Sequence, residues 1–305
     1  MEPGYKIKQE LTIVSGGDSN YFELLKDLLN SLLNLATRQE FNICFLDGGL
    51  KDSEIIYFKS LGVDTVDPGW PNKLSKIKAG KKNHLKVELA KVWLDKLFPE
   101  SESLIWIDAD AWVQDEKAIQ IIKTVMLKKK LAIVSQASRL QKRHMSLKNI
   151  FGPFFLLKNI LYKNAIKAGL KKDIVKNMVA RPTLNAGVFG IERSSPHWER
   201  LRFWQAKLLK NPRVRIFTTT QLALGIISYY EKLSFEALPD ICNYMGPYRW
   251  SKKQNLFTDY YAPYDAVSIM HMVGQDKMRL DKNYTIDIFD EDDNIIKMSL
   301  RYNKS

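Results

Sequence analysis

Two aspartates that directly follow an apolar run are the residues of this sequence best suited to metal chemistry. Asp108 and Asp110 stand two positions apart after the run 104–107, which has the pattern of a buried strand. Two carboxylates at this spacing can bind one hard divalent cation when the strand opens into a turn. Mg²⁺ or Mn²⁺ held there would act as a Lewis acid and stabilise a diphosphate as a leaving group. Two solvated loop acids are the alternative, because this spacing of aspartates is common.

A second polar motif, HMVGQDK, lies much later in the chain, directly after an apolar run. His271 could supply a nitrogen ligand to the same metal. Gly274 would let the backbone approach a phosphate, and Lys277 offers an ammonium group to it. A packed or surface histidine is the alternative, and only the paired aspartates upstream argue against it.

A third motif, RPTLNAGVFGI at 181–191, places small residues around Asn185 at the start of an apolar run. Small side chains leave room for a sugar ring, and the amide of Asn185 could hydrogen-bond a sugar hydroxyl. A simple strand start is the alternative.

The elements that must carry these motifs follow from apolar periodicity. Strands are expected at 11–17, 41–46, 104–107, 131–135 and 186–191, and helices at 18–33, around 55–58, at 84–98 and at 221–230. Because strands and helices alternate at this spacing, we expect an α/β fold with a Rossmann-like, mixed but mostly parallel central sheet flanked by helices. The polar clusters that end the strands should then meet in one crevice at the carboxyl edge of the sheet.

The composition favours one soluble domain in the cytoplasm. A chain of 305 residues that is 45% hydrophobic can bury a sizeable core. It has no apolar run long enough to span a membrane, and its first residues lack the apolar segment of a signal peptide. Cys44 and Cys242 are too few for a disulfide framework or a thiolate metal site, which indicates a reducing compartment.

Together these motifs resemble bacterial glycosyltransferase family 8 and its relatives. The runs 14–33 and 45–62 are similar to the family's first two strand–helix units, and 84–110 resembles the helix and strand that lead into its metal site. The resemblance implies a single GT-A domain over 1–305. Its nucleotide-sugar-binding half would be 1–115 and its acceptor-binding half 116–290, with a basic and apolar insertion at 138–181 and a C-terminal tail at 291–305.

The resemblance also implies a role for each matching residue. Metal ligands would be Asp108, Asp110 and His271; nucleoside contacts Asp18 and Tyr21; diphosphate contacts Gly274 and Lys277; the donor sugar would lie near Asn185 and Gln221; and Lys86 is a weaker candidate for a basic contact. Two positions depart from the family pattern. Thr220 stands where the family usually has an aspartate, and Met278 and Arg279 replace its usual Pro-Trp pair.

By this resemblance the protein is expected to be a retaining glycosyltransferase with Mn²⁺ or Mg²⁺ as cofactor. It would move a hexose from UDP-glucose, UDP-galactose or UDP-N-acetylglucosamine to a glycan or glycolipid acceptor, mainly by positioning groups and stabilising charge. An inverting mechanism, a metal-dependent nucleotide-sugar hydrolase and a non-catalytic nucleotide-sugar-binding protein stay open as alternatives.

The net charge of +13 comes mostly from the segment 138–181, which holds eleven Lys or Arg against the single acid Asp173. An apolar run at 151–157 among these lysines is typical of an interfacial amphipathic helix. We therefore expect the segment to bring the protein to the inner face of an anionic membrane or to a phosphorylated glycolipid. A core helix with a solvated basic face is the alternative. No zinc-finger spacing or RNA-binding signature accompanies the charge, so no nucleic-acid partner is expected.

Overall fold

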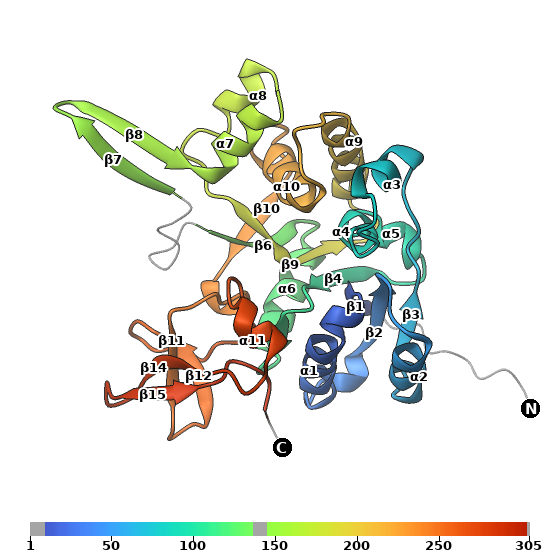
Figure 1. The fold of residues 1–305 in the computed structure, drawn as a ribbon, viewed down its shortest axis with the longest axis vertical. Helices are drawn as coiled ribbons and strands as arrows, with labels where there is room; N and C mark the ends of the chain where they lie inside the picture. Colours follow the sequence, from blue (N-terminus) through green and yellow to red (C-terminus); the bar gives the residue numbers. More distant parts are fainter. Residues whose placement is uncertain (1–9, 137–144, 304–305) are drawn as a thin grey trace, which may run out of the picture.

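The computed structural model describes residues 10–136 and 145–303, and a seven-stranded sheet runs through its centre (Figure 1). The strand order is β10-β6-β9-β4-β1-β2-β3. The strands are β1 (Leu11–Gly17), β2 (Phe41–Asp47), β3 (Asp64–Val66), β4 (Ser103–Ile107), β6 (Leu131–Ser135), β9 (Leu184–Glu192) and β10 (Phe235–Leu238). This sheet confirms the expected Rossmann-like α/β fold.

One strand runs against the others, and this reversal shapes the site. β1 is parallel to β2 and β4, whereas β9 is antiparallel to both β4 and β6. Because β9 is reversed, its first residues lie at the edge where β4 and β6 end. Ile107 is thus paired with Val188, and Ser135 with Leu184.

Helices cover both faces of the sheet because its strands are apolar on both sides (Figure 1). The α-helices of the described chain are α1 (Phe22–Leu33), α2 (Asp52–Ser60), α3 (Lys73–Ala79), α4 (Leu85–Ala90), α5 (Leu94–Leu97), α6 (Lys117–Leu127), α7 (Ile160–Lys167), α8 (Lys172–Lys176), α9 (His197–Leu209), α10 (Thr219–Tyr229) and α11 (Asp276–Leu280). Short 3-10 helices lie at Ser19–Tyr21, Arg38–Glu40, Ile216–Thr218 and Asp240–Cys242. One face of the sheet packs on α1 and α6, and the other on α4, α9 and α10.

Smaller sheets extend the fold beyond the central one. β5 (Ala111–Val113) pairs antiparallel with β13 (Ile269–His271), and this pairing sets His271 opposite Ala111. A four-stranded sheet contains β11 (Tyr248–Ser251), β12 (Leu256–Asp259), β14 (Ile286–Asp290) and β15 (Ile295–Met298). Residues far apart in the sequence are therefore brought to the end of β4.

The basic segment differs from the expected interfacial helix. The apolar run 151–157 lies mostly in a hairpin of β7 (Met145–Phe151) and β8 (Phe154–Asn159), which projects away from the central sheet (Figure 1). Gly152, at φ +51°, and Pro153 form its turn, and both residues disfavour a continuous helix. α7 and α8 follow the hairpin, while residues 138–144 of the expected segment lie outside the described residues.

Two further features concern membranes and helix continuity. Among the described residues, no helix combines the length and the apolar character that crossing a membrane requires. The single helix expected at 84–98 is instead divided into α4 and α5 by a turn at 91–93.

Candidate metal and donor site

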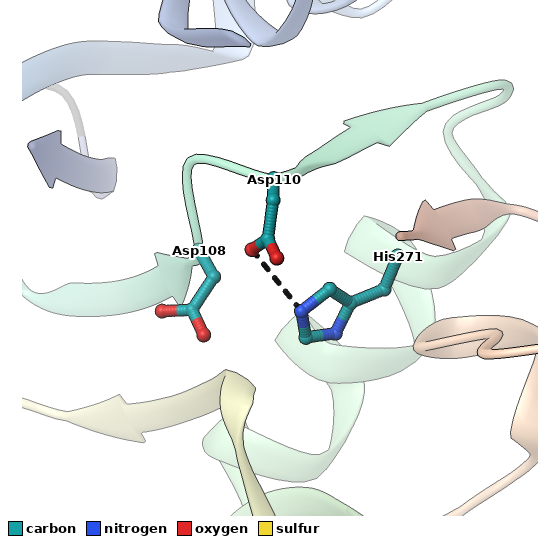
Figure 2. A group of neighbouring side chains, drawn as sticks. All are labelled: Asp108, Asp110 and His271. Carbon is teal, nitrogen blue, oxygen red and sulfur yellow. Dashed lines mark ion pairs between the residues drawn. The ribbon is translucent and has the colours of Figure 1, made fainter. Parts of the chain in front are cut away.

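Three side chains that could bind a metal meet at the carboxyl end of β4 (Figure 2). Asp108 directly follows β4, Asp110 lies in the turn before β5, and His271 is the last residue of β13. One potential ligand atom from each lies within 4.8 Å of the others. The two carboxylates and one imidazole nitrogen form a mixed donor set that suits Mn²⁺.

The imidazole of His271 is held with one nitrogen available to a metal. Its Nδ1 lies 2.7 Å from the amide oxygen of Asn243. That oxygen only accepts, so Nδ1 carries a proton, and Nε2, which is 3.3 Å from Oδ1 of Asp110, is the nitrogen that faces the acids. The Asn243 amide nitrogen donates to Oδ1 of Asn185 at 3.1 Å, which fixes the orientation of the amide. Sequence reasoning did not single out Asn243.

Gly187 on β9 lies against His271, Asn185 and Asp108. A Cβ at this position would be 2.4 Å from Cε1 of His271 and 3.0 Å from Oδ2 of Asp108. The Gly187 carbonyl also accepts a 2.7 Å hydrogen bond from the backbone N–H of Asp108. A glycine is therefore required for β9 to approach the site this closely.

Lys91 is a buried cation of the site that sequence reasoning missed. Its Nζ lies 2.7 Å from Oδ1 of Asp108 and 2.7 Å from Oε2 of Glu88. Trp106 Nε1 donates to the same Asp108 oxygen at 2.6 Å. Burial alone would lower the pKa of Lys91, but Asp108 and Glu88 outweigh it and raise that pKa, so the ammonium stays charged. Lys86, the basic residue expected from the sequence, instead donates to Asp67 at 2.8 Å.

Asp110 remains ionised although it is buried. Burial would raise the pKa of its carboxyl, but His271 and Arg279 outweigh this and lower it to about 2. The Arg279 guanidinium lies 2.7 Å from Oδ2 of Asp110, whereas the other carboxylate oxygen, Oδ1, faces His271. The Asp110 carboxylate is thus charged at neutral pH.

The side chains expected near the donor sugar are joined to this site by polar contacts. Gln221 on α10 donates to Oε1 of Gln136 at 3.2 Å, and Gln136 follows β6. Both Gln136 and Asn185 donate to the sulfur of Met245, at 3.8 and 3.2 Å. Asn185 also accepts from the backbone N–H of Gly187 at 2.7 Å. Gln136 and Met245 were not apparent from the sequence, because only the fold places them here.

The residues expected to contact the nucleoside and the diphosphate lie shortly after β1 and shortly after β13. Asp18 directly follows β1, and its carboxylate is 3.5 Å from Nδ1 of His84. Burial raises the pKa of Tyr21, and nearby charges, among them Arg279 and Asp110, also act on it. Lys277 is exposed on α11, and its ammonium lies 5.6 Å from the Tyr284 ring centre. Gly274 adopts φ +76°, a conformation that favours glycine.

The sequence profile of Glycosyl transferase family 8 matches residues 12–189, which is more than half of the chain. No curated protein sequence matches the chain. Several solved structures share its fold. The galactosyltransferase LgtC, in complex with donor and acceptor sugar analogues, is 14% identical with a TM-score of 0.50, covering 86% of this chain and 87% of its own.

Two further structures are similar at comparable levels. Mouse xyloside xylosyltransferase 1 is 13% identical with a TM-score of 0.51, covering 87% of this chain and 98% of its own. The bifunctional glycosyltransferase WbbM is 12% identical with a TM-score of 0.53, covering 90% of this chain and 47% of its own.

The central sheet and the acidic site at the end of β4 define a glycosyltransferase of the GT-A fold. The chain belongs to glycosyl transferase family 8 and is a nucleotide-sugar-dependent glycosyltransferase. The family resemblance drawn from the sequence is thereby confirmed.

Proposed function

We propose that this protein is a metal-dependent hexosyltransferase that uses a UDP-sugar and retains the configuration of the transferred sugar. The arrangement of Asp108, Asp110 and His271, with Nε2 of the histidine turned toward the acids by the hydrogen bond of Nδ1 to Asn243, is the observation that carries the proposal. Mn²⁺ or Mg²⁺ bound by these three residues would neutralise the departing diphosphate as a Lewis acid. Residues 1–115 would form the nucleotide-sugar-binding half and 116–290 the acceptor-binding half, which would also supply His271, Gly274 and Lys277 to the donor site.

The other side chains of the site would orient the donor and stabilise its charge. Asp18 and Tyr21 would contact the nucleoside, and Gly274 and Lys277 the diphosphate. Lys91 keeps Asp108 in place from a buried position. These roles require side chains that are held in place before the reaction, and the hydrogen bonds and ion pairs of the site would hold them.

The hexose would be contacted by Asn185 and Gln221. Gln221 donates to Gln136 through its amide nitrogen, which leaves its oxygen available. The oxygen of Asn185 accepts from Gly187 and Asn243 and its nitrogen donates to Met245, which leaves one amide N–H available. Amide oxygens and N–H groups can accept from and donate to sugar hydroxyls, and the oxygen of Gln221 can also support positive charge that develops on the sugar ring.

Retention is favoured by the state of the carboxylates around the site. Asp108 binds Lys91, Asp110 binds Arg279, and Glu88 is buried against Lys91. An inverting enzyme needs a carboxylate free to accept a proton from the acceptor. None of these three carboxylates is free in that way, so none of them is a candidate for the base of an inverting mechanism.

The test is donor turnover with a panel of UDP-hexoses, Mn²⁺ and a set of glycan and glycolipid acceptors. We expect UDP release that depends on metal and increases with acceptor, and a product whose anomeric configuration, measured by NMR, equals that of the donor. Equal UDP release without any acceptor would instead indicate a hydrolase. An inverted product would contradict retention.

A glycolipid acceptor at an anionic membrane is proposed from the hairpin and the helices beside it. Leu147, Ile150 and Phe151 near the hairpin turn are 65%, 63% and 79% exposed. Exposed lysines lie on and beside α7 and α8, among them Lys163 and Lys167. Apolar side chains that insert between lipids and cations that attract anionic headgroups are the two features of interfacial binding.

Co-sedimentation with vesicles tests this surface. Wild-type protein should bind vesicles that contain phosphatidylglycerol better than neutral ones, and Phe151→Ser together with Lys163→Gln and Lys167→Gln should reduce that binding. A matched control is Lys59→Gln on α2, an exposed lysine outside the basic segment. Equal partitioning of wild type and the triple variant would refute membrane binding through the hairpin and α7.

A further inference from the structure

Arg279 is an arginine at the metal site whose role nothing in the family pattern assigns. It lies on α11, two positions beyond Lys277, where the family usually has a tryptophan. Its Nη2 is 2.7 Å from Oδ2 of Asp110, and its Nη1 is 3.2 Å from Asp276. The side chain is 22% exposed, so it is mostly enclosed by the site.

The two oxygens of Asp110 face different partners. Oδ1 lies 3.3 Å from Nε2 of His271, on the side where a metal would bind, whereas Oδ2 binds Arg279. A divalent ion could therefore be bound through Oδ1 while Arg279 remains on Oδ2. The guanidinium then adds a fixed positive charge beside the metal position without taking a ligand atom from it.

Arg279 also has hydrogen-bonding capacity that its present contacts do not use. Its Nε is buried and has no hydrogen-bond partner among the described residues. A guanidinium has five N–H donors in a planar fork that matches phosphate oxygens.

Lys277 is placed differently on the same short helix. Its side chain is exposed, and its ammonium lies over the Tyr284 ring at 5.6 Å from the centre. Its charge is therefore hydrated and not directed by a contact to the metal candidates, whereas that of Arg279 is held by Asp110.

We propose that Arg279 is the principal protein cation for the donor diphosphate, held beside the metal by Asp110, and that Lys277 contributes less. The assignment rests on the proposed function, because it requires a nucleoside diphosphate donor. It extends the site by a residue at a position where the family pattern has a different side chain.

Calorimetric titration of UDP and UMP in saturating Mn²⁺ tests the assignment. For Arg279→Gln we expect UDP to bind about tenfold more weakly or worse, because a charge-assisted hydrogen bond is lost, and UMP, which lacks the second phosphate, to change by about twofold at most. Lys277→Gln should weaken UDP by a smaller factor than Arg279→Gln. Arg279→Lys should recover part of the UDP affinity, because it keeps the charge and loses the fork.

A titration with Mn²⁺ alone separates this role from a structural one. If Arg279 only orients Asp110, Arg279→Gln will weaken Mn²⁺ binding, and UDP and UMP will weaken together; that result would overturn the assignment. The proposal expects unchanged or tighter Mn²⁺ binding, because a competing cation is removed from Asp110. A larger UDP loss for Lys277→Gln than for Arg279→Gln would also overturn it. If wild-type protein with Mn²⁺ binds no UDP, the proposed function itself fails.

Discussion

Gly187 lies so close to His271 that a Cβ on the glycine would be 2.4 Å from Cε1 of the imidazole. The same Cβ would be 3.0 Å from Oδ2 of Asp108, so a single methyl group would press on two of the three metal candidates. This contact explains why the small residues at the start of β9 belong to the site. It joins the antiparallel strand of the central sheet to the β5–β13 pair that carries His271.

Gly187→Ala should weaken Mn²⁺ binding by about tenfold or more, as happens when the support of a metal ligand is disturbed. Mn²⁺ titration followed by calorimetry measures it. Gly190→Ala on the same strand is the matched control, because its Cβ would meet Ile122 at 2.3 Å in the core. The control should lower the melting temperature and leave Mn²⁺ affinity unchanged. Equal loss of Mn²⁺ binding in both variants would show that the effect of Gly187 is not local.

Asn243→Ala should weaken Mn²⁺ binding by about 10-fold to 100-fold, the usual cost of removing a group that orients a metal-binding histidine. The cause is loss of the 2.7 Å hydrogen bond that keeps the proton on Nδ1 of His271. Asn243→Asp should retain more affinity, because a carboxylate still accepts from Nδ1. If the alanine variant binds Mn²⁺ like wild type, the orientation of His271 does not depend on Asn243.

Lys91→Met should lower the free energy of unfolding by about 3 to 5 kcal/mol, because it leaves buried carboxylates without their partner. Lys91 is 4% exposed and Glu88 is 9% exposed, so water cannot easily replace the lost contact. Adding Glu88→Gln to Lys91→Met should recover part of the stability, since one of the two stranded charges is removed. Urea unfolding of the single and double variants measures this coupling. Additive effects of the two substitutions would mean that Lys91 and Glu88 do not interact.

His197 should make the protein less stable in mild acid. Burial lowers the pKa of this histidine, although its hydrogen bond to the Ser234 carbonyl acts in the opposite direction. Because the pKa of His197 is lower in the folded state, the unfolded protein binds a proton more readily. The free energy of unfolding is therefore highest above the unfolded pKa of about 6.5 and falls as the pH drops below it.

The loss cannot exceed about 1.4 kcal/mol per pH unit for this one group. Thermal unfolding between pH 5 and 8 should therefore show a smaller pH dependence for His197→Asn than for wild type. Parallel pH curves for the two proteins would contradict the assignment to His197.

Much of the site could be predicted from the sequence because it depends on local patterns. A buried strand that ends in two aspartates places Asp108 and Asp110 at the carboxyl edge of a sheet, and the expected strand was observed as β4. His271 could be added because it follows an apolar run and because two aspartates upstream could share a metal with it, and the family resemblance implied the same role. The structure then brought its side chain to the aspartates through the pairing of β13 with β5.

Residues whose roles depend on contacts between distant segments could not be predicted. Lys91 and Lys86 are both basic residues of one apolar stretch, and only the turn after α4 shows that Lys91 is the one that contacts Asp108. Asn243 and Arg279 reach the site from loops and a short helix with no periodic pattern. The hairpin of β7 and β8 was not predicted, because its apolar composition resembles that of a helix. The Gly152-Pro153 turn is the feature of the sequence that indicates a hairpin there.

The most direct test of the central claim is UDP release from a panel of UDP-hexoses, measured with and without Mn²⁺ for wild type and Asp110→Asn. We expect metal-dependent release that acceptor stimulates in the wild type. We also expect a loss of about 100-fold or more in the variant, because the metal and its charge on the diphosphate are removed together. Release that is independent of metal and unaffected by Asp110→Asn would contradict metal-dependent transfer.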